Sequence, residues 1–170
     1  MTARRGNLLG FLACACLLAY AYYAQYVMHL EPCPLCIFQR IGVFALGVLF
    51  LIAALHDPAA FGRRMYALLQ SLASLATIGI AWRHLYIQSL PPDAVPACGA
   101  SLDFMLKIAS SFGEVLGVLV NVLRGSGECA KVTWEFLGLA MPAWVLISAI
   151  ALGAWGLWVN LRRQPPVLRF

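Results

Sequence analysis

The chain alternates long apolar runs with short segments that carry nearly all of its charges. Stretches without Asp, Glu, Lys or Arg extend from Arg5 to Glu31, from Arg40 to Asp57, from Arg64 to Arg83 and from Glu135 to Arg162. A helix needs about 20 apolar residues to cross the hydrocarbon core of a bilayer. We therefore expect four membrane-spanning helices, over residues 8–28, 36–55, 65–85 and 143–161.

The apolar runs show no alternation of apolar and polar residues, which argues against a transmembrane β-barrel. In lipid, every backbone amide has to be hydrogen-bonded within its own segment, so apolar runs of this length form helices. The expected fold is an all-α integral membrane protein. It consists of one domain over residues 1–170, built as a four-helix bundle.

Composition and charge support the same class. Of the 170 residues, 62% are hydrophobic and 11% are charged, whereas about a quarter of the residues of a soluble domain are charged. So apolar a chain is also not disordered. The net charge of +5 is not gathered in a basic run or a basic–aromatic stripe. The expected partner is therefore the lipid bilayer, and nucleic acid is not expected.

The positive charges predict the orientation. Short segments at both termini and between the second and third spans contain Arg4, Arg5, Arg63, Arg64, Arg162, Arg163 and Arg169. Short loops rich in Lys and Arg stay in the cytoplasm. We expect residues 1–7, 56–64 and 162–170 to be cytoplasmic, and a short loop 29–35 and a long segment 86–142 to be periplasmic, in a bacterial inner membrane.

Two segments need separate treatment. The first apolar run continues to Val27, past the apolar core of a signal peptide, so we expect it to be retained as a span. Residues 115–123 form an apolar run that is too short to span, between Glu114 and Arg124. This run predicts a helix that lies flat in the interface within the long outer segment.

The predicted topology divides the cysteines into two groups. Cys14 and Cys16 fall inside the first span. They lie two residues apart on a helix, so they face different directions and are expected to act as small apolar side chains. The other four, Cys33, Cys36, Cys98 and Cys129, fall on the outer side. That compartment is oxidising, so these four thiols should form disulfides.

Cys33 and Cys36 form a Cys-x-x-Cys motif at the start of the second span. A disulfide in so small a loop adds little stability, which favours a redox role over a structural one. Cys36 opens a helix, and a helix N-terminus stabilises a thiolate. An alternative is half of a zinc site. That site would need two more Cys or His ligands, and there is no second Cys-x-x-Cys motif, so no metal site is expected.

Cys98 and Cys129 are separated by 30 residues. A bridge between them would stabilise a polar loop by about 3–4 kcal/mol, so a structural disulfide is one reading. The other reading is functional, because both lie in segments rich in Gly and Pro that a partner protein could reach. In that case Cys98, beside Pro96 and Gly99, is the sulfur that a partner thiolate attacks.

Four polar side chains near the outer membrane surface are candidates for binding a ligand. Arg40 follows Cys36 by one helical turn, so the two share a face, and a guanidinium there would stabilise a Cys36 thiolate. The alternative is that Arg40 extends to the interface. Gln39 adds a neutral hydrogen-bonding group. His84 ends the third span, with Gln88 one turn beyond, and it either decorates the interface or bonds a ligand carbonyl.

Together these features resemble the DsbB family of disulfide bond formation proteins. The matching elements are Pro-Cys33-Pro-Leu-Cys36-Ile-Phe-Gln-Arg40, His84 with Gln88 before Val-Pro-Ala-Cys98, Glu128-Cys129, and Trp134-Glu-Phe-Leu-Gly-Leu-Ala-Met-Pro-Ala-Trp144. The order of the cysteines and the last stretch are specific. The resemblance covers essentially the whole chain.

The resemblance implies an inner-membrane thiol:quinone oxidoreductase. Such an enzyme reoxidises the periplasmic dithiol oxidase DsbA and passes the electrons to the membrane quinone pool, with ubiquinone favoured over menaquinone. It implies two disulfides, Cys33–Cys36 facing the quinone and Cys98–Cys129 facing DsbA. Cys98 would form the mixed disulfide, and Cys36 would be the thiolate that donates to the quinone.

The resemblance also places Arg40, His84 and Gln88 in the quinone site. Position 39 is often acidic in the family and is Gln here, so we expect proton delivery to differ from the family pattern. Two alternatives stay open. One is a quinone-coupled oxidase of a different DsbA-like partner, and the other is a non-enzymatic four-helix membrane protein with structural disulfides.

Overall fold

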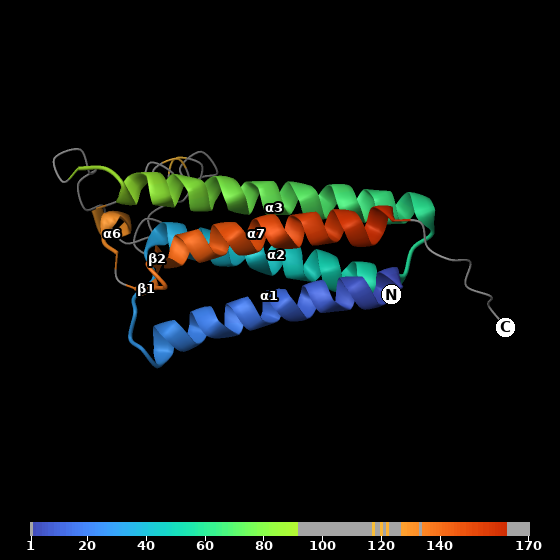
Figure 1. The fold of residues 1–170 in the computed structure, drawn as a ribbon, viewed down its shortest axis with the longest axis horizontal. Coiled ribbons are helices and arrows are strands. Elements are labelled where there is room, and N and C mark those ends of the chain that lie inside the picture. The colour runs from blue at the N-terminus through green and yellow to red at the C-terminus, as the bar shows by residue number, and fades with distance from the viewer. Residues whose placement is uncertain are drawn as a thin grey trace.

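The computed structural model describes residues 2–91, 117, 120, 122, 127–132 and 134–162. Its long helices are α1 (Ala3–Tyr26), α2 (Pro34–His56), α3 (Ala60–Gln88) and α7 (Met141–Leu161), and all four are long and apolar enough to cross a membrane. They run side by side along one axis, and α1 begins at the end of the bundle where α7 stops (Figure 1). The expected four-helix membrane fold is confirmed.

All four helices begin before the predicted spans, α1 and α3 by five residues each because they continue through arginines that a bilayer core would not hold, whereas α1 ends at Tyr26, two residues short of its predicted end. Helix α1 begins at Ala3, where the Thr2 side chain caps it by accepting from the Arg5 backbone N–H. Helix α2 begins at Pro34, with Cys33 as its N-cap, and proline is favoured in the first turn. The cap therefore places the Cys-x-x-Cys motif across a helix N-terminus.

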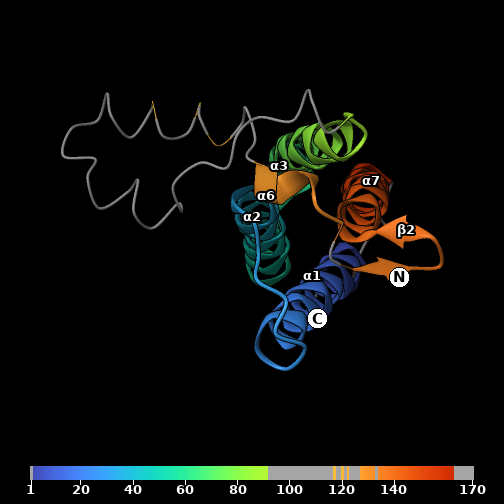
Figure 2. The same cartoon turned by 90° about the vertical axis from the view of Figure 1, so that its left-hand side faces the viewer.

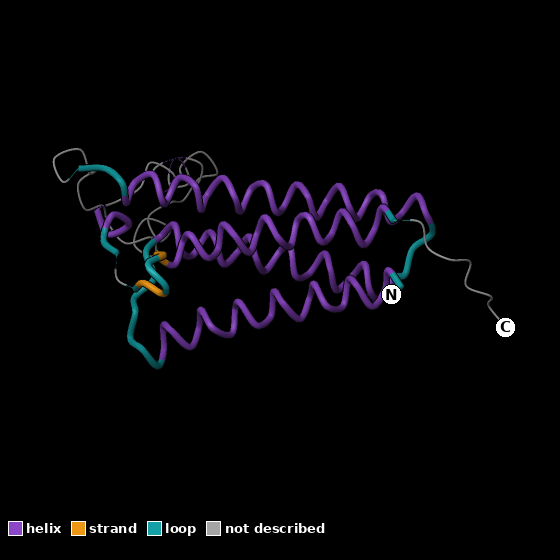
Figure 3. Tube along the Cα trace, viewed as in Figure 1, coloured by secondary structure: helices purple, strands orange, loops and turns teal. Residues whose placement is uncertain are grey.

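A short β-hairpin, which the sequence analysis did not predict, precedes α7 in this otherwise helical fold. Strands β1 (Glu135–Phe136) and β2 (Leu139–Ala140) pair antiparallel. The turn residues Leu137 and Gly138 have φ angles of 52° and 74°, the backbone that two-residue hairpin turns require. Strands of two residues are too short to leave an alternating pattern in the sequence. Figure 3 shows the hairpin at the end of the bundle opposite to the chain's N-terminus.

The long segment between α3 and α7 lies largely outside the described residues, and so does Cys98. A four-residue helix, α6 (Gly127–Ala130), lies over the ends of α2 and α3 (Figure 2). Within the predicted interfacial helix, Gly117, Val120 and Val122 are described and helical. Val122 is buried with Leu35 of α2 and Ile87 of α3. That side chain therefore packs on the bundle.

Small residues bring the helices close together. Added Cβ atoms would meet Cys14 of α1 at Gly47, Ser74 of α3 at Gly153 and Gln70 of α3 at Gly156. Such close approach is the usual basis of helix association in membranes. Cys14 is buried in the core beside Phe50 and Cys16 is exposed, both as free thiols, in agreement with their predicted role as small apolar side chains.

Three buried amide side chains join α1, α3 and α7 near the end of the bundle where the chain starts; we call Asn7, Gln70 and Asn160 the amide cluster. Asn7 Nδ2 donates to Asn160 Oδ1 at 3.0 Å, and Asn160 Nδ2 donates to Gln70 Oε1 at 2.9 Å. Gln70 Nε2 completes the ring by donating to Asn7 Oδ1 at 3.1 Å. The sequence analysis did not single out these residues.

Candidate functional site

Four reactive side chains meet at the end of the bundle opposite to the amide cluster; we call Cys33, Cys36, His84 and Cys129 the thiol cluster. They come from the start of α2, the end of α3 and the short helix α6. Cys33 Sγ, His84 Nε2 or Nδ1, and Cys129 Sγ all lie within 4.8 Å of one another. The fold thus joins the Cys-x-x-Cys motif to a cysteine almost a hundred residues further along the chain.

The geometry of Cys33 and Cys36 follows from the helix start. Cys33 Sγ accepts from the Cys36 backbone N–H at 3.4 Å, and the Cys33 thiol donates to Cys36 Sγ at 3.2 Å. A disulfide bond is about 2.05 Å long, so this structure holds the pair as two thiols. The Cys33–Cys36 disulfide stays a prediction, and the hydrogen-bonded sulfurs are close enough to form it with little movement.

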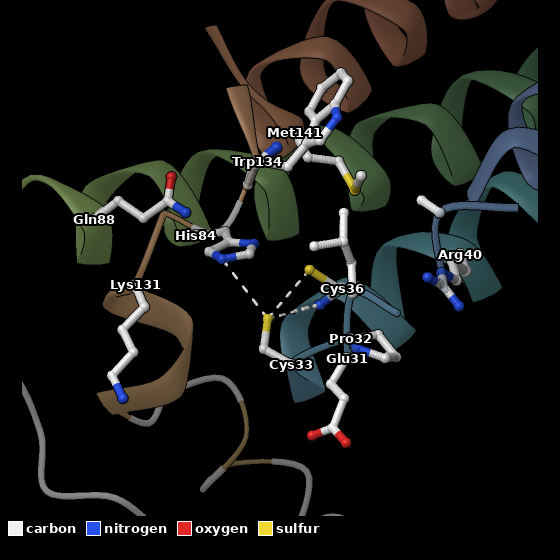
Figure 4. A pocket seen from close by; sticks show the side chains of 13 residues that line it. Glu31, Pro32, Cys33, Cys36, Arg40, His84, Gln88, Lys131, Trp134 and Met141 are labelled. Atoms are coloured by element: carbon white, nitrogen blue, oxygen red, sulfur yellow. Dashed lines mark hydrogen bonds between the residues drawn. The ribbon is translucent and has the colours of Figure 1, made fainter. Parts of the chain in front are cut away.

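His84 is the polar centre of the thiol cluster and is only 2% exposed. Its Nε2 lies 3.1 Å from the Cys129 carbonyl oxygen and 3.7 Å from Cys33 Sγ (Figure 4). A carbonyl only accepts, so Nε2 carries the proton that it donates to Cys129 O. His84 therefore ties α3 to α6 and faces Cys33. This position excludes the reading of His84 as an interfacial side chain.

Gln39 supports His84 from α2. It is 3% exposed, and its Nε2 lies 3.1 Å from His84 Nδ1. With the Nε2 proton of His84 given to Cys129 O, Nδ1 is the acceptor of the Gln39 amide. The sequence analysis noted Gln39 only as a nearby neutral group. Its spacing of three residues from Cys36, which puts both on one helix face, was the available signal.

Arg40 is held by helix α1. Its Nη1 donates to the Gln25 side-chain oxygen, its Nη2 donates to Ala21 O at 3.1 Å, and its guanidinium carbon lies 5.4 Å from the centre of the Tyr22 ring. Figure 4 shows the side chain directed away from Cys33 and His84. Within the described residues no hydrogen bond joins Arg40 to Cys36. Helix α1 thus offers the guanidinium three partners, and the stabilisation of a Cys36 thiolate by Arg40 stays a prediction.

Two cavities meet at Cys36. The smaller, about 50 Å³, is lined by Cys33, Cys36, His84, Gln88 and Lys131, among others. The larger, about 380 Å³, lies between α1, α2 and α7 and is lined mainly by apolar side chains, with Gln39, Arg40 and Ser148 as polar groups. Cys36 and Arg40 line both cavities. The reactive motif therefore connects a polar pocket to an apolar one, and Gln88 lies in the polar pocket.

Aromatic rings frame the larger cavity. Trp134 lies 5.9 Å from the Tyr20 ring of α1 and 6.0 Å from Phe136, and Phe136 lies 5.9 Å from Trp144 of α7. All four rings line the cavity. The hairpin β1–β2 is fastened to α7 by Trp144 Nε1, which donates to Phe136 O at 3.2 Å. The unpredicted hairpin thus places Phe136 beside the cavity.

Only one cysteine of the second predicted pair, Cys129, lies within the described residues. Cys129 is 1% exposed and packs with Leu35 and Ile87, whereas Cys98 lies outside the described residues. The Cys98–Cys129 disulfide therefore stays a prediction. What the structure adds is the location of Cys129 beside Cys33, which spacing in the sequence did not predict.

Comparison with known proteins gives a consistent result. The family model described as "Disulfide bond formation protein DsbB" matches residues 3–159. A protein of Nitrosococcus oceani named "Disulfide bond formation protein B" is 52% identical over 150 residues, covering 88% of this chain and 86% of that protein. Proteins of the same name from Marinobacter nauticus and Methylococcus capsulatus are 48% and 50% identical, over 98% and 95% of this chain and 96% and 98% of those proteins.

Proposed function

The chain belongs to the DsbB family of disulfide bond formation proteins, and from this premise we propose that it reoxidises a DsbA-like periplasmic dithiol oxidase and passes the electrons to membrane quinone. It is a multi-pass membrane protein and a disulfide-generating oxidoreductase. The observation that carries the proposal is the location of Cys36, which lines both the polar pocket of the thiol cluster and the large apolar cavity.

The proposed exchange begins at the outer surface. A thiolate of reduced DsbA attacks Cys98 of the Cys98–Cys129 disulfide, a mixed disulfide forms, and Cys129 leaves as a thiolate. The second DsbA thiol then attacks the mixed disulfide, which releases oxidised DsbA and the Cys98 thiol. DsbA-type proteins are strong oxidants, so only a strong electron acceptor keeps them oxidised.

The second exchange lies within the thiol cluster. The Cys129 thiolate attacks Cys33 of the Cys33–Cys36 disulfide, and Cys36 leaves as a thiolate. Cys98, once deprotonated, then attacks Cys129, which reforms the Cys98–Cys129 disulfide and releases Cys33 as a thiol. The first of these steps is supported by the short distance between the attacking sulfur of Cys129 and the attacked sulfur of Cys33, which lie within 4.8 Å of each other. Cys36 is well suited to be the leaving group because it lies in the first turn of α2, where helix amides stabilise a thiolate.

His84 and Gln39 support this exchange. The proton that His84 Nε2 donates to the Cys129 carbonyl holds α6 against α3, so that the Cys129 sulfur stays beside Cys33 at the start of α2. Gln39 holds the His84 ring by its bond to Nδ1. His84 Nε2 also lies 3.7 Å from Cys33 Sγ. We assign it the transfer of protons to and from the sulfurs.

The larger cavity fits a quinone ring. Its volume of about 380 Å³ falls in the usual range of cofactor pockets, which are apolar with a few polar groups that fix orientation. Arg40 and Gln39 would bind the polar ring oxygens, and the aromatic side chains would contact the ring. Bound there, a quinone accepts two electrons and two protons, so that two thiols become one disulfide and quinone becomes quinol.

The orientation belongs to the same proposal. The arginines beside the amide cluster favour a cytoplasmic location for that end by the positive-inside rule, and we include this orientation in the proposal. The thiol cluster then faces the periplasm, where DsbA-like proteins reside. The bilayer position suits both partners, since the donor is a water-soluble protein and the acceptor is soluble in lipid.

The experiment that tests the function is turnover with purified protein. Reduced DsbA and a ubiquinone or menaquinone analogue are mixed with the protein in detergent, and thiol loss and quinone absorbance are followed together. We expect one quinone consumed per DsbA disulfide formed. The Cys36→Ser variant should show no turnover, with Cys16→Ser as a matched control that keeps full turnover. Equal turnover in Cys36→Ser, or DsbA oxidation without quinone loss, would contradict the proposal.

A further inference from the structure

The thiol cluster presents a ligand set that suits a soft metal ion. Cys33, His84 and Cys129 offer two sulfurs and one imidazole nitrogen within 4.8 Å of one another, and Cys36 Sγ lies 3.2 Å from Cys33 Sγ. We propose that the reduced thiol cluster binds Zn²⁺ through Cys33, His84 and Cys129, with Cys36 as the fourth ligand. The sequence analysis set such a site aside because two ligands were missing, and the fold supplies them from α3 and α6.

The distances between the ligand atoms fit this ion. Zn–S bonds of about 2.3 Å and Zn–N bonds of about 2.0 Å in a tetrahedron place two sulfurs about 3.8 Å apart and a sulfur and a nitrogen about 3.6 Å apart. Cys33 Sγ and His84 Nε2 are 3.7 Å apart, and the Cys33 and Cys36 sulfurs are 3.2 Å apart. The Cys129 sulfur lies within 4.8 Å of the other two ligand atoms, so it has to approach them by about 1 Å to reach the bonding distances.

The surroundings of His84 also suit a ligand. Nε2 has to release its proton to bind a metal, and the ring then carries its proton on Nδ1. A metal-bound histidine normally donates this second N–H to a carbonyl or carboxylate oxygen. Gln39 lies 3.1 Å from Nδ1, and a flip of its amide group presents Oε1 as the acceptor. The neutral Gln39 therefore serves both forms of the ring.

Binding is an exchange of protons for a metal ion, without electron transfer. Three thiols bind one Zn²⁺ as thiolates and release three protons, and His84 binds as the neutral imidazole. A disulfide offers no thiolate, so only the reduced cluster binds and oxidation prevents binding. Zn²⁺ would hold the sulfurs that the exchange needs and stop turnover. This last consequence rests on the proposed function, whereas the binding does not.

The test measures binding without DsbA or quinone. Full-length protein in detergent is reduced with a phosphine and titrated with Cd²⁺, whose thiolate complexes absorb in the ultraviolet, and Zn²⁺ is then added to displace the Cd²⁺. We expect one ion per reduced chain and none per oxidised chain. His84→Ala and Cys129→Ser should each weaken binding at least tenfold. The Cys14→Ser/Cys16→Ser double variant, which removes two thiols outside the cluster, should bind like the unmodified chain.

Two further variants test whether weaker binding is caused by misfolding. Cys129→Ala and His84→Asn are compared with the unmodified chain by helix content and by elution as a single species before titration. Folded variants that bind Cd²⁺ with unchanged affinity would overturn the inference, since the ion would then need only Cys33 and Cys36. Absence of binding to the reduced chain would overturn it as well.

The turnover assay separates this inference from the proposed function. We expect micromolar Zn²⁺ to inhibit DsbA oxidation and a chelator to restore it. Binding by a chain that never turns over would refute the proposed function and leave the zinc site standing. Turnover without binding would refute the zinc site and leave the proposed function standing.

Discussion

The two ends of the bundle both bury polar side chains among apolar helices, and they do so in opposite ways. In the amide cluster every donor meets an acceptor, and Asn160 Nδ2 alone donates to Asn7, Gln70 and the Gly156 carbonyl. In the thiol cluster the sulfurs make long contacts to one another and to His84, beside two cavities. Polar groups that hold a membrane bundle together satisfy one another, whereas the groups of the thiol cluster also border open space.

The spacing between α1 and α7 also differs between the two ends of the bundle. Near the amide cluster, Trp155 Nε1 of α7 donates to Gly6 O of α1 at 2.9 Å. Towards the thiol cluster, α1 diverges from α7 (Figure 1), and the cavity of about 380 Å³ lies between them. Stability is concentrated where the helices touch, and space for a ligand is found where they separate. Substitutions at the two ends should therefore change different measured quantities.

The largest effect is expected at Cys33. Cys33→Ser should remove steady-state DsbA oxidation completely, because the exchange from Cys129 to Cys36 passes through this sulfur. The thermal unfolding midpoint should stay within about 2 °C, since the change of one atom at a half-buried site costs little. Turnover and thermal unfolding measured on the same sample check both parts. Residual turnover would show that another thiol replaces Cys33.

A smaller loss is expected at His84. His84→Asn should lower kcat by about 100-fold, the lower range for loss of a group that transfers protons. Asn keeps a donor near the Cys129 carbonyl, so α6 should stay in place. Single-turnover exchange between the two cysteine pairs, followed by acid trapping of thiols, is the measurement. A normal exchange rate with slow quinone reduction would instead move the role of His84 to the quinone step.

A still smaller effect is expected at Arg40. Arg40→Ala should raise the KM for quinone about tenfold, equal to about 1.4 kcal/mol of lost binding, and change kcat less. Arg40→Lys keeps the charge but not the paired contacts with Gln25 and Ala21. Its KM for quinone should therefore lie between the values of the unmodified protein and of Arg40→Ala. Steady-state turnover over a range of quinone concentrations separates KM from kcat. Equal KM values in all three proteins would exclude Arg40 from the quinone site.

The amide cluster should respond in stability and hardly in activity. Asn160→Leu leaves Asn7 and Gln70 with fewer partners and should cost about 1–2 kcal/mol of unfolding free energy, the upper range for hydrogen bonds between membrane helices. Turnover per folded molecule should stay within about twofold. Denaturation in mixed micelles and a turnover assay supply the two values. Loss of turnover at unchanged stability would contradict the assignment of stability to the amide cluster and of turnover to the thiol cluster.

The smallest effect is expected for the thiols of α1. Cys14→Ser with Cys16→Ala should keep turnover within experimental error, because neither thiol lines the polar pocket. Some stability should be lost at Cys14, which is 1% exposed and faces Gly47. The single variants, measured in parallel, assign the loss to one position. A fall in turnover larger than the fall in stability would give these thiols a chemical role.

The sequence predicts the helices well because the physics of a span is local. A run without charges and a capped start such as Thr2 or Cys33 depend only on nearby residues. The Cys-x-x-Cys motif is equally local, so its place at a helix start was predictable. The helix ends were less predictable, because helices continue through arginines that stay outside the hydrocarbon core of the bilayer.

The rest of the site depends on contacts between distant segments. The approach of Cys129 to His84 requires the position of α6, which no spacing in the chain contains. The direction of Arg40 depends on Gln25 of α1, and single amides such as Gln70 look unremarkable inside an apolar run. The hairpin turn at Leu137 requires a positive φ at a residue that rarely adopts one. None of these follows from a local pattern.

Because α1 diverges from α7, a small rotation of α1 about its start produces a larger displacement at its far end. The helix has 24 residues, which corresponds to a length of about 36 Å. It is fixed near its start by Asn7 and Gly6, and Arg40 fastens it again close to its far end. A pivot of about 3° around the fixed start would move the far end by about 2 Å. An arginine on α2 therefore ties the diverging end of α1 to the second helix, on the side of the gap away from α7.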